Sequence, residues 1–230
     1  MPQFAATVRL GTSTAPVTLL LTQELVNTQG PVTYNVDLLA DAASAQEWLD
    51  GVLADWPAET PRIRLGKSEL EELRAVRASV LHLLARGEER LYQVAAPPLD
   101  ASFHVKAGPD GVEASPVGTG IEWIASAVAL ELFRAREHDL LRRLKMCHNP
   151  GCATVFYDRS KNNSRAWHDV ATCGNQANVR AYRARQKAVE AEFHRRKSLT
   201  SSPTKLATSS TSTTIRNSPA RAAAARTSGP

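Results

Sequence analysis

Four residues with metal-binding side chains lie in two evenly spaced pairs in the last third of the chain. The pairs are Cys147-x4-Cys152 and His168-x4-Cys173, with fifteen residues between them. Thiolate and imidazole groups at this spacing suit a tetrahedral Zn²⁺ ion, because a short loop lets both members of a pair reach one metal. Since four protein ligands leave no position open for water, we expect a structural zinc site and not a catalytic one.

The three cysteines of the chain all belong to this set. An odd, clustered number of cysteines argues against a disulfide framework and for a reducing compartment, so we expect a cytoplasmic protein. The start of the chain has no secretory signal, and no stretch reaches the ~20 apolar residues of a membrane span. The alternative is that the cysteines are unrelated, one of them being buried as a small apolar side chain.

The residues around the ligands predict a small zinc finger. Asn149-Pro150-Gly151 is a turn sequence between the first two cysteines, and Gly174 lets the backbone pass close to a metal-bound sulfur. A miniature core is expected from four apolar side chains, Val155, Phe156, Tyr157 and Trp167. Because a core of this size cannot fold alone, zinc binding should supply much of the folding free energy of the finger.

A basic helix is predicted directly after the last ligand, over residues 175–196. Its residues Gln176, Arg180, Arg183 and Lys187 are spaced to share one helical face. Arg and Lys neutralise phosphates, whereas Gln can read an adenine edge. The candidate DNA-binding residues of this helix and the preceding loop are Arg159, Lys161, Arg165, Gln176, Arg180, Arg183, Arg185 and Lys187.

This segment resembles the CGNR zinc finger, which is named for a Cys-Gly-Asn-Arg run. The chain has Cys173, Gly174 and Asn175, but Gln176 stands at the place of the arginine. Further matches are the first cysteine pair, the run Phe156-x-Asp158-x-Ser160, Asn163 and Arg165-x-Trp167. The family usually has cysteine where this chain has His168, so the resemblance implies a Cys3His site.

The resemblance extends upstream to the ABATE domain that precedes CGNR fingers, over roughly residues 4 to 190 in all. Its matches are Leu25-Val26-Asn27-Thr28, Asp37-Leu38-Leu39 and Trp48-Leu49. It implies a stress-induced transcription regulator whose front domain senses a small-molecule effector near Asn27, Thr28 and Trp48. The plainer interpretation of Asn27 is that its side chain bonds the local backbone and ends a helix.

Charge is distributed unevenly along the chain. Residues 1–119 hold nine Lys/Arg against fifteen Asp/Glu, whereas residues 147–197 hold ten against four. An acidic front with a basic C-terminal third suits a protein that meets nucleic acid through one end, although a basic helix can also be merely solvated.

The periodicity of the remaining chain predicts an α+β fold with a mostly helical front and a short sheet. Apolar residues four apart predict helices, and alternating ones predict strands. The expected elements are a strand at 4–10, helices at 16–27, 41–54 and 69–86, a short element at 91–95, a hairpin at 103–112 and a helix at 121–145. The helix at 41–54 is expected to start at Asp41 or at a capping box of Ser44 and Glu47. The helix at 69–86 is expected to start at a capping box of Ser68 and Glu71. The predicted domains are an α/β front at 1–119, a connecting helix at 120–146, the finger at 147–197 and a disordered tail at 198–230.

These features favour a zinc-containing DNA-binding transcription regulator, with double-stranded DNA as partner and Zn²⁺ as cofactor. The alternative is an RNA-binding or protein-interaction module in which zinc only stabilises the fold. An enzyme is not expected, since the sequence has no nucleophile–base pair, no phosphate-binding glycine loop and no catalytic metal motif. The oligomeric state is left open.

Overall fold

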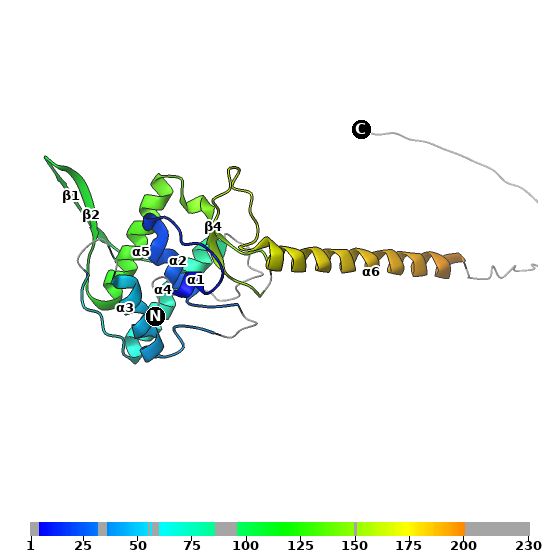
Figure 1. Ribbon diagram of the computed structural model, residues 1–230, viewed down its shortest axis with the longest axis horizontal. Coiled ribbons are helices and arrows are strands. Elements are labelled where there is room, and N and C mark those ends of the chain that lie inside the picture. The colour runs from blue at the N-terminus through cyan, green and yellow to red at the C-terminus, as the bar shows by residue number, and fades with distance from the viewer. Residues whose placement is uncertain are drawn as a thin grey trace, which may run out of the picture. The chain divides into compact units, whose positions relative to one another are not determined.

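The computed structural model describes residues 5–31, 36–54, 56, 60–85, 96–149 and 151–200 (Figure 1). The predicted element at 91–95 and nearly all of the predicted tail lie outside these residues. The described helices are α1 (Ala5–Val8), η1 (Val17–Leu19), α2 (Leu20–Asn27), α3 (Ala42–Leu53), α4 (Lys67–Ala85), α5 (Gly120–Glu137), η2 (Leu141–Arg143), η3 (Val170–Gly174) and α6 (Asn175–Thr200). The strands are β1 (Phe103–Gly108), β2 (Gly111–Pro116), β3 (Leu144–Met146) and β4 (Val155–Tyr157).

The chain forms two compact units that divide within α6, residues 1–184 and residues 185–230. Residues 147–184 of the predicted finger therefore belong to the same unit as the front of the chain, and neither predicted boundary, at residue 119 or 146, coincides with the division. The fold class is α+β, as predicted, with two antiparallel two-stranded sheets. Among the described residues, no helix is both long and apolar enough to cross a membrane.

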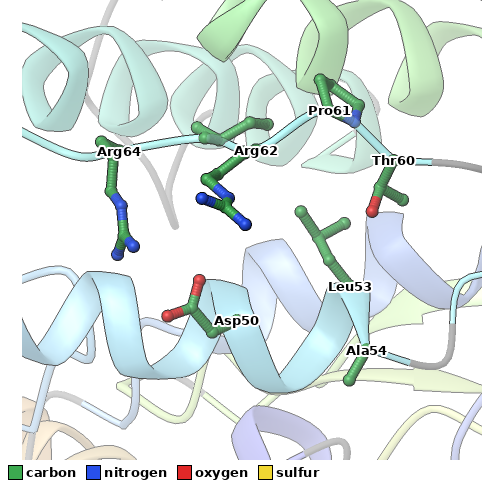
Figure 2. Close-up of a pocket in the computed structure, with 8 residues that line it drawn as sticks. Asp50, Leu53, Ala54, Thr60, Pro61, Arg62 and Arg64 are labelled. Atoms are coloured by element: carbon green, nitrogen blue, oxygen red, sulfur yellow. The ribbon is translucent and has the colours of Figure 1, made fainter.

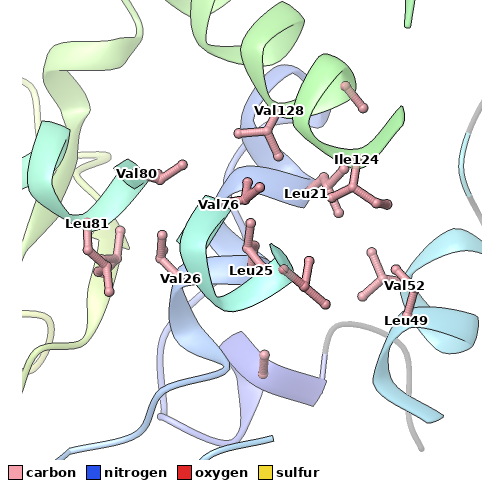
Figure 3. Packing of buried hydrophobic residues seen from close by; sticks show 14 of the residues in the cluster. Leu21, Leu25, Val26, Leu49, Val52, Val76, Val80, Leu81, Ile124 and Val128 are labelled. Carbon is pink, nitrogen blue, oxygen red and sulfur yellow. The ribbon is translucent and has the colours of Figure 1, made fainter. Parts of the chain in front are cut away.

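The short helix α2 is the centre of the core. Seven of its eight residues are buried, because α1, α4 and α5 all pack against it. Figure 3 shows Leu21, Leu25 and Val26 of α2 among apolar side chains of the surrounding helices. The labelled neighbours in that view are Leu49 and Val52 of α3, Val76, Val80 and Leu81 of α4, and Ile124 and Val128 of α5. The predicted helix at 16–27 is thus confirmed as η1 followed by α2.

Two buried carboxylates hold helix starts in this core. Glu131 of α5 accepts hydrogen bonds from the backbone N–H groups of Leu21 and Thr22 at the start of α2. Burial raises the pKa of Glu131 to about 7, although these hydrogen bonds oppose the shift. Glu24 of α2 accepts from the N–H groups of Ala6 and Thr7, at 3.1 and 2.9 Å. Each carboxylate satisfies donors that a helix N-terminus leaves free.

The predicted strand at 4–10 is wrong, because Ala5–Val8 forms helix α1. The alternation of apolar residues there is real, but the segment packs against α2 instead of pairing with a strand. The carboxylate of Glu24 binds its first N–H groups, and this contact favours a helical turn. Since Glu24 lies 18 residues from Ala6, local pattern alone could not reveal it.

The predicted helix at 121–145 is also wrong in its second half, and with it the connecting helix at 120–146. Helix α5 ends at Glu137, and Asp139 takes a left-handed φ of 57°. The chain then forms η2 and strand β3, which pairs antiparallel with β4. Leu144 and Met146 are buried on alternate positions of β3, so pairing with a strand eleven residues later overrides the helical pattern.

The other predicted elements are confirmed with small shifts. Asp41 accepts a hydrogen bond from Ser44 N and opens α3, so the later capping box is not used. Helix α4 begins two residues before its predicted start, where Glu69 accepts from Gly66 N in place of the expected Ser68–Glu71 box. The hairpin β1–β2 turns at Pro109-Asp110, and residues 175–200 are helical.

Candidate metal centre

The four predicted ligands lie together, and their ligand atoms are all within 4.8 Å of one another. The three cysteines are buried, and His168 is half-buried. Sulfur ligands bound at ~2.3 Å to one tetrahedral zinc would lie about 3.8 Å apart, so small movements suffice to close the set on a metal. The donor chemistry and spacing therefore fit Zn²⁺.

The first ligand pair is placed by the β3–β4 hairpin. Cys147 follows β3, and its N–H donates to Thr154 O at 2.9 Å, which extends the pairing past the strands. Cys152 N donates to Asn149 O at 2.9 Å and closes the predicted turn. Gly151 within that turn has a φ of +83°, a conformation that a side chain would strain.

The second ligand pair is placed by a capped turn at the start of α6. Asp169 accepts from Ala171 N at 2.8 Å, and its backbone oxygen accepts from Cys173 N at 3.0 Å. The chain passes through the single π-turn η3 into α6, so the last ligand, Cys173, lies directly before the first turn of the helix. A Cβ added at Gly174 would lie 3.3 Å from Val170 Cγ1, so a larger residue here would have to displace the exposed Val170 side chain slightly.

Hydrogen bonds connect the ligand atoms to one another and to Thr154. Cys152 Sγ lies 3.2 Å from Thr154 Oγ1 and 3.4 Å from His168 Nδ1. A hydrogen bond from Cys147 is the largest cause lowering the pKa of Cys152, and sharing that proton raises the pKa of Cys147. Because metal ligation needs thiolates, zinc binding would release this shared proton.

Asn149 joins the metal centre to the first turns of α6. It is buried, and its Nδ2 donates to Cys173 Sγ and to Gln176 Oε1, both at 3.1 Å. Its Oδ1 accepts from Arg180 Nη2. One amide therefore contacts a ligand sulfur and two predicted DNA-binding residues. From its sequence context Asn149 is expected only to form a turn, and its place between two cysteines is the available signal for a further role.

A second buried group, Asp158, holds the long loop that connects the two ligand pairs. Its carboxylate accepts from Lys145 Nζ at 2.8 Å and from the N–H groups of Ser160 and Arg165 at 2.8 and 2.9 Å. Burial alone would raise the pKa of Asp158, but these hydrogen bonds lower it well below its usual range. The family run Phe156-x-Asp158-x-Ser160 thus has a structural role in this chain.

The predicted DNA-binding residues fall into three groups. Arg159 and Arg165 lie over the rings of Tyr157 and Phe156, with guanidinium carbons 5.6 and 5.3 Å from the ring centroids. Gln176 and Arg180 meet at Asn149, as described above. The remaining four are exposed: Lys161 and Arg183 in the first unit, and Arg185 and Lys187 in the second.

The predicted effector-binding residues Asn27, Thr28 and Trp48 are buried in the core. The Asn27 amide pairs with both backbone groups of Val155, and Thr28 Oγ1 donates to Leu25 O. Trp48 Nε1 lies 3.4 Å from Glu24 Oε2. Their polar atoms are therefore used inside the protein. Helix α2 does end at Asn27, but the Asn27 side chain binds Val155 and Thr7 and not, as the plainer interpretation expected, the local backbone.

A cavity of ≈ 390 Å³ borders the metal centre and gives it a route to solvent. Cys152, His168 and Cys173 line one side of the cavity, and Arg9 and Pro31 line another.

Comparison with protein families supports the same site. Residues 143–186 match the family model of the CGNR zinc finger, and this range includes all four ligands. A search of curated proteins returned no match. The chain therefore contains a CGNR-type finger with a Cys3His set that fits Zn²⁺.

The histidine ligand can be tested by two substitutions at one position. We expect one zinc per chain for the wild type, retention of zinc in His168→Cys, and loss of most zinc in His168→Ala, because only cysteine restores a fourth donor. Zinc content is measured by elemental analysis after dialysis against a weak chelator. Full zinc retention in His168→Ala would show that another residue completes the site.

The role of Asn149 can be tested through metal affinity. Asn149→Ala removes the hydrogen bond to Cys173 Sγ, and loss of such a bond typically lowers metal affinity about 10–100-fold. Competition with a chromogenic chelator measures this change. The neighbouring exposed His148→Ala is the matched control and should bind zinc like the wild type; equal affinity of both variants would contradict the assignment.

Proposed function

We propose that this chain is a zinc-containing DNA-binding transcription regulator whose finger presents the first turns of α6 to duplex DNA. The observation that carries the proposal is the Asn149 contact between the ligand Cys173 and the side chains of Gln176 and Arg180. It orients a residue able to read a base and a residue able to hold a phosphate before any partner arrives. Such preorganisation reduces the entropy lost on binding.

The charge of this region supports the proposal. Residues 147–197 carry ten Lys/Arg against four Asp/Glu, and Arg183 is exposed on the first turns of α6. Phosphate contacts supply most non-specific affinity for DNA, while contacts to base edges supply specificity. Arg159 and Arg165 lie over aromatic rings of the finger, and Arg165 Nη2 also donates to His168 O, so the charge of Arg165 lies beside the second ligand pair.

The front of the chain would then act as the effector-sensing part. Its path to the finger is the contact between α2 and β4, in which Asn27 and Gln23 bind the backbone of Val155. An effector that favours one position of α2 would also favour one position of β4. Because β4 pairs with β3, it would thereby shift Cys147, the metal-binding residue that follows β3. This direct packing replaces the helical linker that the sequence analysis expected.

An RNA-binding or protein-interaction module is the second candidate. The observation that favours a protein partner is the exposure of Val179 and Tyr182, at 47% and 57%. Exposed apolar and aromatic side chains are enriched at protein interfaces, so this surface fits a partner as well as a solvated helix.

The proposal predicts the effects of two substitutions on binding of the zinc-loaded full chain to a duplex selected from random DNA. Arg183→Ala should reduce the slope of log K against log salt concentration by about one unit, because one phosphate contact is lost. Gln176→Ala should instead cost ~1–3 kcal/mol on the selected sequence only. Fluorescence anisotropy at several salt concentrations measures both.

Arg136→Ala, an exposed change on α5, is the matched control and should bind like the wild type. A truncation after Lys197 tests the basic residues that follow. If the truncation abolishes binding while the variants at 176 and 183 bind like the wild type, the contact lies in the tail. Preference for single-stranded or duplex RNA over DNA would favour the second candidate.

A further inference from the structure

A cleft on the front of the chain, far from the metal centre in sequence, brings three charged side chains together. It lies between the end of α3 and the extended segment 60–66, with a volume of ≈ 320 Å³. Figure 2 shows Arg62 and Arg64 reaching from the segment toward α3, and Asp50 reaching from α3 to meet them. The lining residues are Asp50, Leu53, Ala54, Thr60, Pro61, Arg62, Ile63 and Arg64. The volume is that of a small-metabolite site.

One side chain, Gln46 of α3, fixes both walls of this cleft. Its Nε2 donates to Ile63 O at 3.1 Å, and its Oε1 accepts from Leu65 N at 2.8 Å, so its amide pairs with the segment as a neighbouring strand would. The same Nε2 donates to Asp50 Oδ1 at 2.7 Å. The backbone that carries the two arginines and the carboxylate below them are therefore held by a single group.

The alternation of the extended segment explains why both arginines reach the same side. Ile63 is buried at 4% exposure and anchors the segment in the core, so residues 62 and 64 point away from that anchor. Within the described part of the chain, neither Arg62 nor Arg64 forms an ion pair. Arg74 and Arg77 on α4 do form ion pairs, with Glu71 and Asp37. The two guanidinium groups are thus available to a ligand, beside a carboxylate that they do not neutralise by contact.

We propose that this cleft binds a small zwitterion, with its anionic group on Arg62 and Arg64 and its ammonium group on Asp50. A simple anion would leave Asp50 without a partner, and a simple cation would leave the two arginines without one, so a ligand with both charges uses all three groups. Guanidinium groups bind carboxylates and phosphates through paired hydrogen bonds. Leu53, Ala54 and Pro61 at one end offer contact to a short apolar part.

This inference deepens the proposed function, since the cleft would be the effector site of the regulator. The role as effector site rests on the proposed function, whereas the binding of a zwitterion in the cleft does not. The test uses the zinc-loaded full chain and isothermal titration with each proteinogenic α-amino acid and with phosphoethanolamine. These probes distinguish a carboxylate from a phosphate as the anionic group. Acetate and inorganic phosphate serve as probes with negative charge only, and ethylammonium as a probe with positive charge only.

We expect at least one zwitterion to bind saturably at millimolar concentration or below, and more tightly than any single-charge probe. Arg62→Gln and Arg64→Gln should each lower its affinity about tenfold or more. Asp50→Asn should weaken the zwitterion but not acetate or phosphate, because only the ammonium group loses its partner. Arg136→Gln, an exposed arginine on α5, is the matched control and should leave the affinity unchanged.

Absence of binding by every zwitterion would overturn the inference, as would equal affinity of the wild type and the Arg62→Gln/Arg64→Gln double variant. DNA binding of the same variants without ligand keeps the two proposals apart. Zwitterion binding by a chain that does not bind DNA would refute the regulator and leave the cleft assignment standing. DNA binding without binding of any zwitterion would support the regulator and refute the cleft assignment.

Discussion

The pairing between the Asn27 amide and the backbone of Val155 is the contact on which the rest of this structure depends. Val155 N donates to Asn27 Oδ1 and Asn27 Nδ2 donates to Val155 O, both at 2.9 Å, while Gln23 Nε2 adds a bond to the same oxygen at 3.2 Å. Among the described strands, β4 pairs with β3 alone, so the other edge of β4 would be left with buried unpaired groups. Each such group costs about 1–3 kcal/mol when it is left unpaired. Asn27 and Gln23 of α2 avoid this cost, because they bind the backbone groups of Val155 that a second neighbouring strand would otherwise bind.

The metal centre is consequently built on the main core and not beside it. Val155 and Tyr157 of β4 belong to the same apolar cluster as α2, α4 and α5, although the sequence suggested a separate miniature core for the finger. Of the four side chains expected in that core, Trp167 packs against the cysteines. Because β3 and β4 place Cys147 and Cys152, stabilisation of the metal centre and stabilisation of the core are linked.

The sequence predicted what short-range chemistry determines. The four ligands, helices α3, α4 and α6, and the hairpin β1–β2 follow from spacing, periodicity and turn residues that lie close together in the chain. Helix α1 was missed because Glu24, which binds its first N–H groups, is distant in sequence. Strand β3 was missed because its local pattern is helical and only its pairing with β4 makes it a strand. Asn27 was identified as important, but a sequence cannot distinguish an amide facing a ligand from one bound to buried backbone. The three contacts of Asn149 likewise become visible only after Cys173 and α6 fold next to it.

Amide hydrogen exchange before and after zinc removal tests the link between metal and core most directly. If the Asn27 pairing couples them, chelation should speed exchange at Val155 and also at Leu25–Thr28 in the last turn of α2. Asn27→Ala, compared with the exposed Asn162→Ala, should make exchange in α2 independent of zinc. The account would be contradicted if chelation exposed only residues 147–174 and left the protection of α2 unchanged.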